Sequence, residues 1–455
     1  MDPSIENSNT TEILADFTAN LHYNQIPKHV RELMKNILLD ALACAIAGHL
    51  GEETQQVASF ASGIAQSKES SIIGGDYLSL AGATLLNGYL VTAVTMCDIH
   101  RPTTTHIMPE VLPPALAIAE RDCIPGRDLL VALTVGCETA TRIGIGLDYP
   151  AFRNRGFHGP GVIGPFGAAA SVGRLLEFNP EKMAAAFGLA GSQSAGTFAA
   201  WGTPTVKFHQ CRGALSGLMA ALLAQQGFLG TRQILTATDG GLFYSYSNGG
   251  RPEEVIKNLG SRWELEEIAL RLWPSASTIQ GLITAMFDMV EKEGIGPEQT
   301  KKVRVFLSKV AFDMHGGFSI YQGKFEALLS THYVTAVILH DKILTLSQFE
   351  PERYNDPTLK KFATDQVEVI CDPSLEGSQA VVVTKLLDGK TIEVKCDNPR
   401  GAPQNPLTRS EIEEKFRTYA LPLLSNSNVN EIINIISNIE NLESTNRLMD
   451  LLRKV

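Results

Sequence analysis

The strongest constraint on this chain is a helical periodicity that runs from about residue 11 to residue 230. Apolar residues recur there at the spacing of helix faces, Ala and Gly are unusually frequent, and strand patterns are scarce. Small residues also recur four positions apart, at Gly213, Gly217 and Ala221, which lets neighbouring helix backbones approach closely. The pattern predicts a tightly packed helical domain with several layers.

The periodicity changes after about residue 260. The alternating apolar and polar residues typical of strands occupy three segments, 302–312, 366–371 and 380–394. Within the last of these, Asp388-Gly389 is a strong signal for a hairpin turn. Residues 408–455 then return to helical spacing with a polar surface.

These two patterns predict a mainly α protein with two domains. We expect a large all-helical domain that is discontinuous in sequence and comprises residues 1–264 and 405–455. A smaller α+β domain is expected over residues 265–404. The length of 455 residues is consistent with this division, because a single ordinary core rarely extends so far.

Composition limits the partners and the location of the protein. The 39 basic and 49 acidic residues give a net charge of -10, so the chain lacks the basic field that binds nucleic acid. Seven cysteines are scattered without metal-ligand spacing, a pattern typical of a reducing compartment. The N-terminal sequence resembles no signal or transit peptide, and the most apolar stretch, 37–47, is too short to span a membrane. We therefore expect a cytoplasmic protein without nucleic-acid, membrane or metal partners.

Three segments concentrate titratable residues in apolar surroundings. The first, 96–106, contains Asp98, His100 and His106 and follows a long apolar helix pattern. Binding residues favour such loops, but the same pattern is expected for a solvated loop with a helix-capping aspartate.

The other two segments each precede a helix rich in small residues. His158 is flanked by glycines in 156–161 and could present its ring and backbone N–H groups to an anion; a flexible turn is the alternative. Lys207, within 202–210, is placed to bind a carboxylate, although a surface lysine with a buried stem is the more common outcome.

Together these segments resemble the signature of the MmgE/PrpD family, which includes 2-methylcitrate dehydratases, cis-aconitate decarboxylases and iminodisuccinate epimerases. The resemblance covers nearly the whole chain. It also rests on the small-residue helices within 156–176 and 202–230, on Trp273-Pro274-Ser275, and on the late helix pattern of 329–337.

The resemblance implies a fold, an assembly and a type of chemistry. The helical domain would be capped by the α+β domain as a lid, with the site between them. The protein would be a homodimer, and its reaction would need neither a metal nor an organic cofactor.

The resemblance also implies roles for individual residues. His106 is similar to the family's catalytic histidine, and we expect Asp98, His158 and Lys207 to act with it. The substrate-binding residues would be His100, Tyr333, Gln280 and, more speculatively, Arg271.

The sequence departs from the family pattern at three places. Only Asp98 remains of an aspartate cluster, and its spacing to His100 and His106 is closer to fungal cis-aconitate decarboxylases than to 2-methylcitrate dehydratases. Gln280 stands where relatives usually have a histidine. Lys207 lies one position later than the usual lysine, with Val206 in its place.

We hypothesise a cofactor-independent lyase, a dehydratase or decarboxylase, that acts on a small di- or tricarboxylate. His106, tuned by Asp98, would transfer a proton at a carbon alpha to a carboxylate, since a base near pKa 7 suits that step. His158 and Lys207 would stabilise the developing negative charge. We also expect His100, His106, His158 and Lys207 to attract the anion together. An epimerase or isomerase in the same pocket, or a non-catalytic homologue, are the alternatives.

Overall fold

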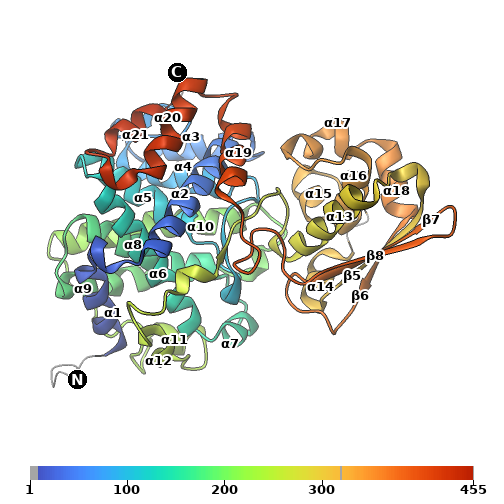
Figure 1. Ribbon diagram of the computed structural model, residues 1–455. Coiled ribbons are helices and arrows are strands. Elements are labelled where there is room, and N and C mark those ends of the chain that lie inside the picture. Colours follow the sequence, from blue (N-terminus) through green and yellow to red (C-terminus); the bar gives the residue numbers. More distant parts are fainter. Residues whose placement is uncertain (1–8, 318–319, 454–455) are drawn as a thin grey trace. The chain divides into compact units, whose positions relative to one another are not determined.

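The computed structural model describes residues 9–317 and 320–453, and the chain divides into two compact units. The helical unit combines the chain up to Ile268 with the chain from Thr408 onward, and the mixed unit comprises Ala269–Leu407 (Figure 1). Helices dominate the described residues and the sheets are small, so the prediction of a mainly α protein is confirmed.

The helical unit is built from helices joined mostly by short loops. They are α1 (Thr10–Asn20), α2 (Lys28–Ala47), α3 (Thr54–Ile64), α4 (Leu80–Thr92), α5 (Met108–Arg121), α6 (Gly126–Gly146), α7 (Tyr149–Asn154), α8 (Gly159–Leu175), α9 (Pro180–Gly191), α10 (Thr205–Gln225), α11 (Leu242–Tyr246), α12 (Pro252–Ile256), α19 (Arg409–Ala420), α20 (Asn426–Ser437) and α21 (Asn446–Leu452). Short strands β1 (Ser70–Ser71), β2 (Tyr77–Leu78) and β3 (Ile99–His100) lie in its loops, and β4 (Ile268–Ala269) lies where the chain passes into the mixed unit.

Small residues let α8 and α10 pack at close range, as the four-residue spacing predicts. A Cβ atom added at Gly217 would lie 2.5 Å from the Pro165 carbonyl oxygen and 2.3 Å from the Ala168 Cβ atom. Both distances are far below van der Waals contact, so only glycine fits there. The close approach of these two helices sets the position of residues at the start of each.

Two helices of this unit are long and apolar enough to span a membrane by length and composition alone. They are Lys28–Leu50 and Gly126–Gly146, and 78% and 94% of their apolar windows are buried within the structure. Such burial is typical of core helices.

The C-terminal tail belongs to the helical unit, where the red helices lie beside the blue ones in Figure 1. Helix α19 packs on α2, and the Lys415 Nζ atom lies 2.6 Å from the Asp40 Oδ1 atom, with both side chains 1% exposed. Lys415 also donates to the Met96 carbonyl at 3.2 Å. The tail therefore holds the backbone two residues before Asp98.

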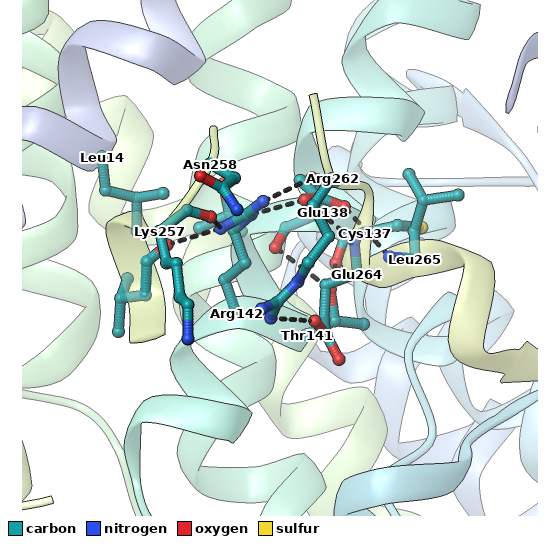
Figure 2. Close-up of polar contacts among 12 residues, drawn as sticks. Leu14, Cys137, Glu138, Thr141, Arg142, Lys257, Asn258, Arg262, Glu264 and Leu265 are labelled. Atoms are coloured by element: carbon teal, nitrogen blue, oxygen red, sulfur yellow. Dashed lines mark hydrogen bonds and ion pairs between the residues drawn. The ribbon is translucent and has the colours of Figure 1, made fainter. Parts of the chain in front are cut away.

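A second buried ion pair fixes the segment that leaves α12. Arg142 of α6 binds Glu138 at 2.5 Å and donates to the carbonyls of Val255, Lys257 and Arg262. Figure 2 shows Arg142 among Glu138, Lys257 and Arg262. The Glu138 carboxylate in turn accepts the backbone N–H groups of Glu264 and Leu265, each at 3.0 Å. Because both charges have several hydrogen-bond partners, the pair can remain buried without the penalty of an isolated charge.

The mixed unit contains a four-stranded sheet in the order β6-β5-β7-β8, against which α13 and α16 pack. Its elements are α13 (Gln280–Glu293), β5 (Thr300–Leu307), α14 (Lys309–His315), α15 (Lys324–Leu329), α16 (Thr331–Asp341), α17 (Pro351–Tyr354), α18 (Pro357–Asp365), β6 (Val367–Cys371), β7 (Ala380–Leu386) and β8 (Thr391–Cys396).

The strands and the hairpin turn of this sheet agree with the sequence pattern, except at the end of β5. β5 runs parallel to β6, with Val305 opposite Val369, and antiparallel to β7. Gly389 has a φ of 95° in the β7–β8 turn, so the Asp-Gly hairpin prediction is confirmed. The strand predicted over 302–312 ends at residue 307, because the Ser308 hydroxyl accepts the Ala311 N–H at 3.3 Å and begins α14.

Candidate functional site

Asp98 fixes the loop that carries His106. Its carboxylate accepts the backbone N–H groups of Ile107 at 3.0 Å and Met108 at 3.1 Å, at the start of α5. A carboxylate here satisfies N–H groups that have no partner within the helix and complements the positive end of the helix dipole. The capping alternative for Asp98 is therefore what the structure shows, and the same residue also binds His106 through its main chain.

The Asp98 carbonyl determines which nitrogen of His106 carries a proton. His106 Nδ1 lies 2.7 Å from the Asp98 carbonyl oxygen, and 3.5 Å from the Cys97 sulfur. A carbonyl oxygen can only accept, so His106 Nδ1 must donate. In the neutral ring the lone pair then resides on Nε2, which is the arrangement that a general base requires.

His158 is positioned by backbone pairing just before α8. The His158 N–H donates to the Gly196 carbonyl at 3.0 Å, and the Phe198 N–H donates to the Gly156 carbonyl at 2.7 Å. Gly196 has a φ of 143°, and a Cβ atom there would lie 3.2 Å from His209 Nδ1. The absence of a side chain at residue 196 therefore allows this segment to lie over the His209 ring.

His158 and His209 form a hydrogen-bonded pair of imidazole rings. Their Nδ1 atoms are 3.1 Å apart, so one nitrogen donates and the other accepts. Burial first, and then the charges of His209, His106 and Arg153, together lower the pKa of His158 to about 3. Burial also lowers the pKa of His209. His158 is consequently a neutral ring near pH 7.

The cluster joins side chains from three segments of the helical unit. His106 comes from the loop before α5, His158 from the start of α8 and His209 from α10. The effect of His106 on the pKa of His158 shows that these two predicted residues are brought together. His209 was missed as a site residue, although it lies in the third polar segment; its distance from His158 in the sequence gave no signal of their contact.

Lys207 is buried against a carboxylate of the protein itself. It is 4% exposed, and its Nζ atom lies 3.1 Å from the Glu53 Oε2 atom, which also accepts the Tyr89 hydroxyl at 2.6 Å. Burial acts to raise the pKa of Glu53, but the Lys207 charge and the two hydrogen bonds lower it overall. Glu53 is therefore ionised and occupies the kind of position that a substrate carboxylate would take.

His100 makes its contacts inside the core. Its ring is fully buried, with Nδ1 2.8 Å from the Thr103 hydroxyl and Nε2 3.4 Å from the Glu264 carboxylate, without hydrogen-bond alignment. Burial lowers the pKa of His100, although the Glu264 carboxylate acts in the opposite direction. His158 is likewise neutral near pH 7 and Lys207 is paired with Glu53, so the joint attraction of an anion by His100, His106, His158 and Lys207 stays a prediction.

The predicted residues of the mixed unit are buried in it. Arg271 and Gln280 both donate to the Ser275 carbonyl, at 3.0 and 3.3 Å, which places them around one turn. The Tyr333 hydroxyl donates to the Gln348 carbonyl, and its ring lies against Tyr321 and Phe349. His315 at the end of α14 is fully buried and hydrogen-bonded to the Leu329 carbonyl at 3.0 Å.

Among residues 9–317 and 320–453, no group of three or more His, Cys, Asp and Glu side chains is arranged to hold a metal ion. The independence from metal and organic cofactors stays a prediction.

A mainly α fold that gathers histidines with defined proton positions is typical of an enzyme that moves protons. The MmgE/PrpD N-terminal domain matches residues 12–255, and the MmgE/PrpD C-terminal domain matches residues 273–441. The chain belongs to the MmgE/PrpD family, as its motifs indicate.

Curated relatives are similar over nearly the full length. A cis-aconitate decarboxylase-like protein of Aspergillus oryzae is 28% identical, over 99% of this chain and 98% of its own length. The cis-aconitate decarboxylase of Aspergillus terreus is 27% identical, over 98% of this chain and 96% of its own length. The human cis-aconitate decarboxylase is 28% identical, over 97% of this chain and 94% of its own length. The family and these relatives identify the chain as a lyase.

Proposed function

We propose that this lyase decarboxylates cis-aconitate by proton transfer from His106. The observation that carries the proposal is the 2.7 Å contact between His106 Nδ1 and the Asp98 carbonyl, which fixes a proton on Nδ1 and so assigns the proton transfer to Nε2. The names of the relatives support the substrate, and the Asp98 to His106 spacing favours decarboxylation over dehydration.

The reaction requires one proton and one place to hold negative charge. CO2 leaves from the carboxylate on the methylene carbon, and the electron pair of the broken bond forms a new terminal double bond. The original double bond then shifts its electrons to the former vinyl carbon, which is alpha to a second carboxylate. The His106 imidazolium adds its Nε2 proton to that carbon. The product is a dicarboxylate with a terminal methylene group, and atoms and charge balance.

The neutral His158 ring serves as a hydrogen-bond donor in this scheme. If His209 Nδ1 donates to His158 Nδ1, the proton of His158 resides on Nε2 and can bind the enolate-like oxygen that develops. A neutral imidazole with a low pKa keeps this proton throughout the reaction, as an electrophilic group must.

The other predicted residues keep their roles within the proposal. Lys207 would bind a substrate carboxylate by exchanging it for Glu53, and Asp98 would hold the His106 loop. His100, Tyr333, Gln280 and Arg271 are proposed to support the substrate site.

The assembly and location form part of the same proposal. A homodimer is supported by four exposed apolar side chains that end α10 and follow it, namely Met219, Leu223, Phe228 and Leu229. Such a patch is unusual on a monomer surface. Sedimentation velocity should give twice the chain mass. A cytoplasmic location is supported by the seven cysteines, none of which forms a disulfide within the described residues.

The catalytic assignment is tested with His106→Gln. Gln retains a donor near the Asp98 carbonyl but cannot transfer a proton, so CO2 release from cis-aconitate should fall on the order of 100-fold or more. Unchanged turnover in His106→Gln, or water loss from 2-methylcitrate without CO2 release from cis-aconitate, would contradict the proposal.

A further inference from the structure

Two groups that were expected to bind the substrate carboxylates are neutral or already paired in the structure. His158 is neutral near pH 7, and the Lys207 ammonium is paired with Glu53. A substrate with several carboxylates still needs a cation near the reacting carbon, because a buried carboxylate without a partner is strongly destabilised.

Arg153 of α7 is a cation placed beside this cluster. Its guanidinium carbon lies 3.2 Å from the centroid of the Phe198 ring, and its charge lowers the pKa of His158. Within the part of the chain that the structure describes, no hydrogen bond and no ion pair engages the Arg153 side chain. An aromatic face holds the cation without supplying a hydrogen-bond acceptor, so the N–H groups of the guanidinium stay available.

The neighbouring Arg212 shows the contrast. Its guanidinium is half-buried as well, but it donates to the carbonyls of Gln193, Gly161 and Ala195 at 2.7–2.9 Å. Its donors are used to hold the loop before α10. Arg212 thus stabilises the fold, whereas the Arg153 guanidinium makes no such hydrogen bonds to described residues.

The fold fixes Phe198 and thereby Arg153. The Phe198 N–H donates to the Gly156 carbonyl at 2.7 Å, and its ring meets the His158 ring edge-on with centroids 6.0 Å apart. The guanidinium, the phenyl ring and the imidazole therefore form one group. A stacked guanidinium loses little freedom on binding, and its planar set of donors matches both oxygens of a carboxylate.

We propose that Arg153, held on Phe198 beside His158, is a substrate-binding residue that takes one carboxylate of the polycarboxylate in a bidentate pair. The inference rests on the proposed function, since it assigns the carboxylate partner of that site. It predicts a preference for substrates with a carboxylate that can reach Arg153 while another part of the molecule meets His106.

Three variants test the assignment. Arg153→Gln removes the charge, Arg153→Lys keeps the charge but loses the planar fork, and Arg155→Gln changes an exposed arginine two residues away as a matched control. For cis-aconitate, KM should rise roughly 10- to 100-fold in Arg153→Gln and less in Arg153→Lys. The kcat should change much less, and Arg155→Gln should match the wild type.

Binding of propane-1,2,3-tricarboxylate, an unreactive tricarboxylate, is measured in parallel by calorimetry. Its Kd should rise more in Arg153→Gln than in Arg153→Lys. The melting temperature of each variant should stay within a few degrees of the wild type. Equal KM and equal Kd in Arg153→Gln and Arg155→Gln would overturn the assignment. A wild-type protein that binds this tricarboxylate but does not decarboxylate cis-aconitate would instead refute the proposed function, and the calorimetric comparison would still decide the role of Arg153.

Discussion

His209 is hydrogen-bonded to His158, a residue far from it in the sequence. The 3.1 Å contact between the two Nδ1 atoms makes the tautomer of His158 depend on which ring donates. His209 is thus a positioning residue, because it acts on the reaction through His158.

Two replacements of His209 distinguish its role as a hydrogen-bond donor to His158 from its role in packing. The amide of His209→Asn can still donate toward His158 Nδ1, whereas His209→Leu cannot, so kcat should fall on the order of 10-fold or more only in the leucine variant. Steady-state kinetics with cis-aconitate measure this, and melting temperatures report any structural loss. Equal kcat in both variants and in the wild type would show that the pair does not set the His158 tautomer.

Single residues also show how far the sequence could predict this site. His106 and His158 lie in compact polar motifs, which is why spacing and resemblance select them as candidates. The partner of Lys207 could not be found in this way, because Glu53 is brought to it by the packing of distant helices. No sequence motif singles out Arg153 or His209. The backbone pairing at Gly196 brings the segments around them together, and only the fold shows this.

At the level of elements, helix periodicity was the reliable signal and short strands were not. Strand β5 ends where Ser308 can cap a helix, a local hydrogen bond that competes with the alternation of apolar residues beyond it. Helix α19 illustrates the converse. Its amphipathic pattern predicted a helix, but only the fold shows that its buried Lys415 reaches Asp40 and the Met96 carbonyl.

The ion pair between α2 and α19 should be essential for the stability of the helical unit. Lys415→Met leaves the buried Asp40 carboxylate without its cation, so the free energy of unfolding should fall by about 3–5 kcal/mol. Urea denaturation measures the loss, and Arg417→Met on the same helix is the control, because Arg417 lies at the surface and hydrogen-bonds to the exposed Asn430.

The double variant Asp40→Leu with Lys415→Met gives a further check. It removes both charges and should recover much of the lost stability, because no uncompensated charge remains. Equal destabilisation of the single variant and of the Arg417→Met control would show that the pair contributes little.

For the whole molecule, buried neutral histidines should make stability sensitive to acid. Burial lowers the pKa of His315 to about 4, so between about pH 4 and pH 6.5 the unfolded chain binds a proton that the folded chain does not. Stability must therefore decrease as the pH falls through this range. From pH 7 to pH 5, His315 should account for about 2 kcal/mol of the decrease.

His315→Asn tests this contribution, since its amide can replace the Nδ1–H that donates to the Leu329 carbonyl. The free energy of unfolding, measured in urea at several pH values, should decrease less steeply in the variant. His22→Asn changes an exposed histidine and should keep the wild-type slope. A wild-type slope in His315→Asn would contradict the prediction.

The central claim, that His106 protonates the former vinyl carbon after CO2 has left from the methylene carbon, is tested most directly by proton NMR of cis-aconitate and the wild-type protein in D2O. The account predicts CO2 release together with a methylene dicarboxylate that carries one deuterium at the carbon alpha to its carboxylate. The resonances of this deuterated product should be absent with His106→Gln. Solvent deuterium in unreacted substrate without CO2, or hydration products without CO2, would contradict the account.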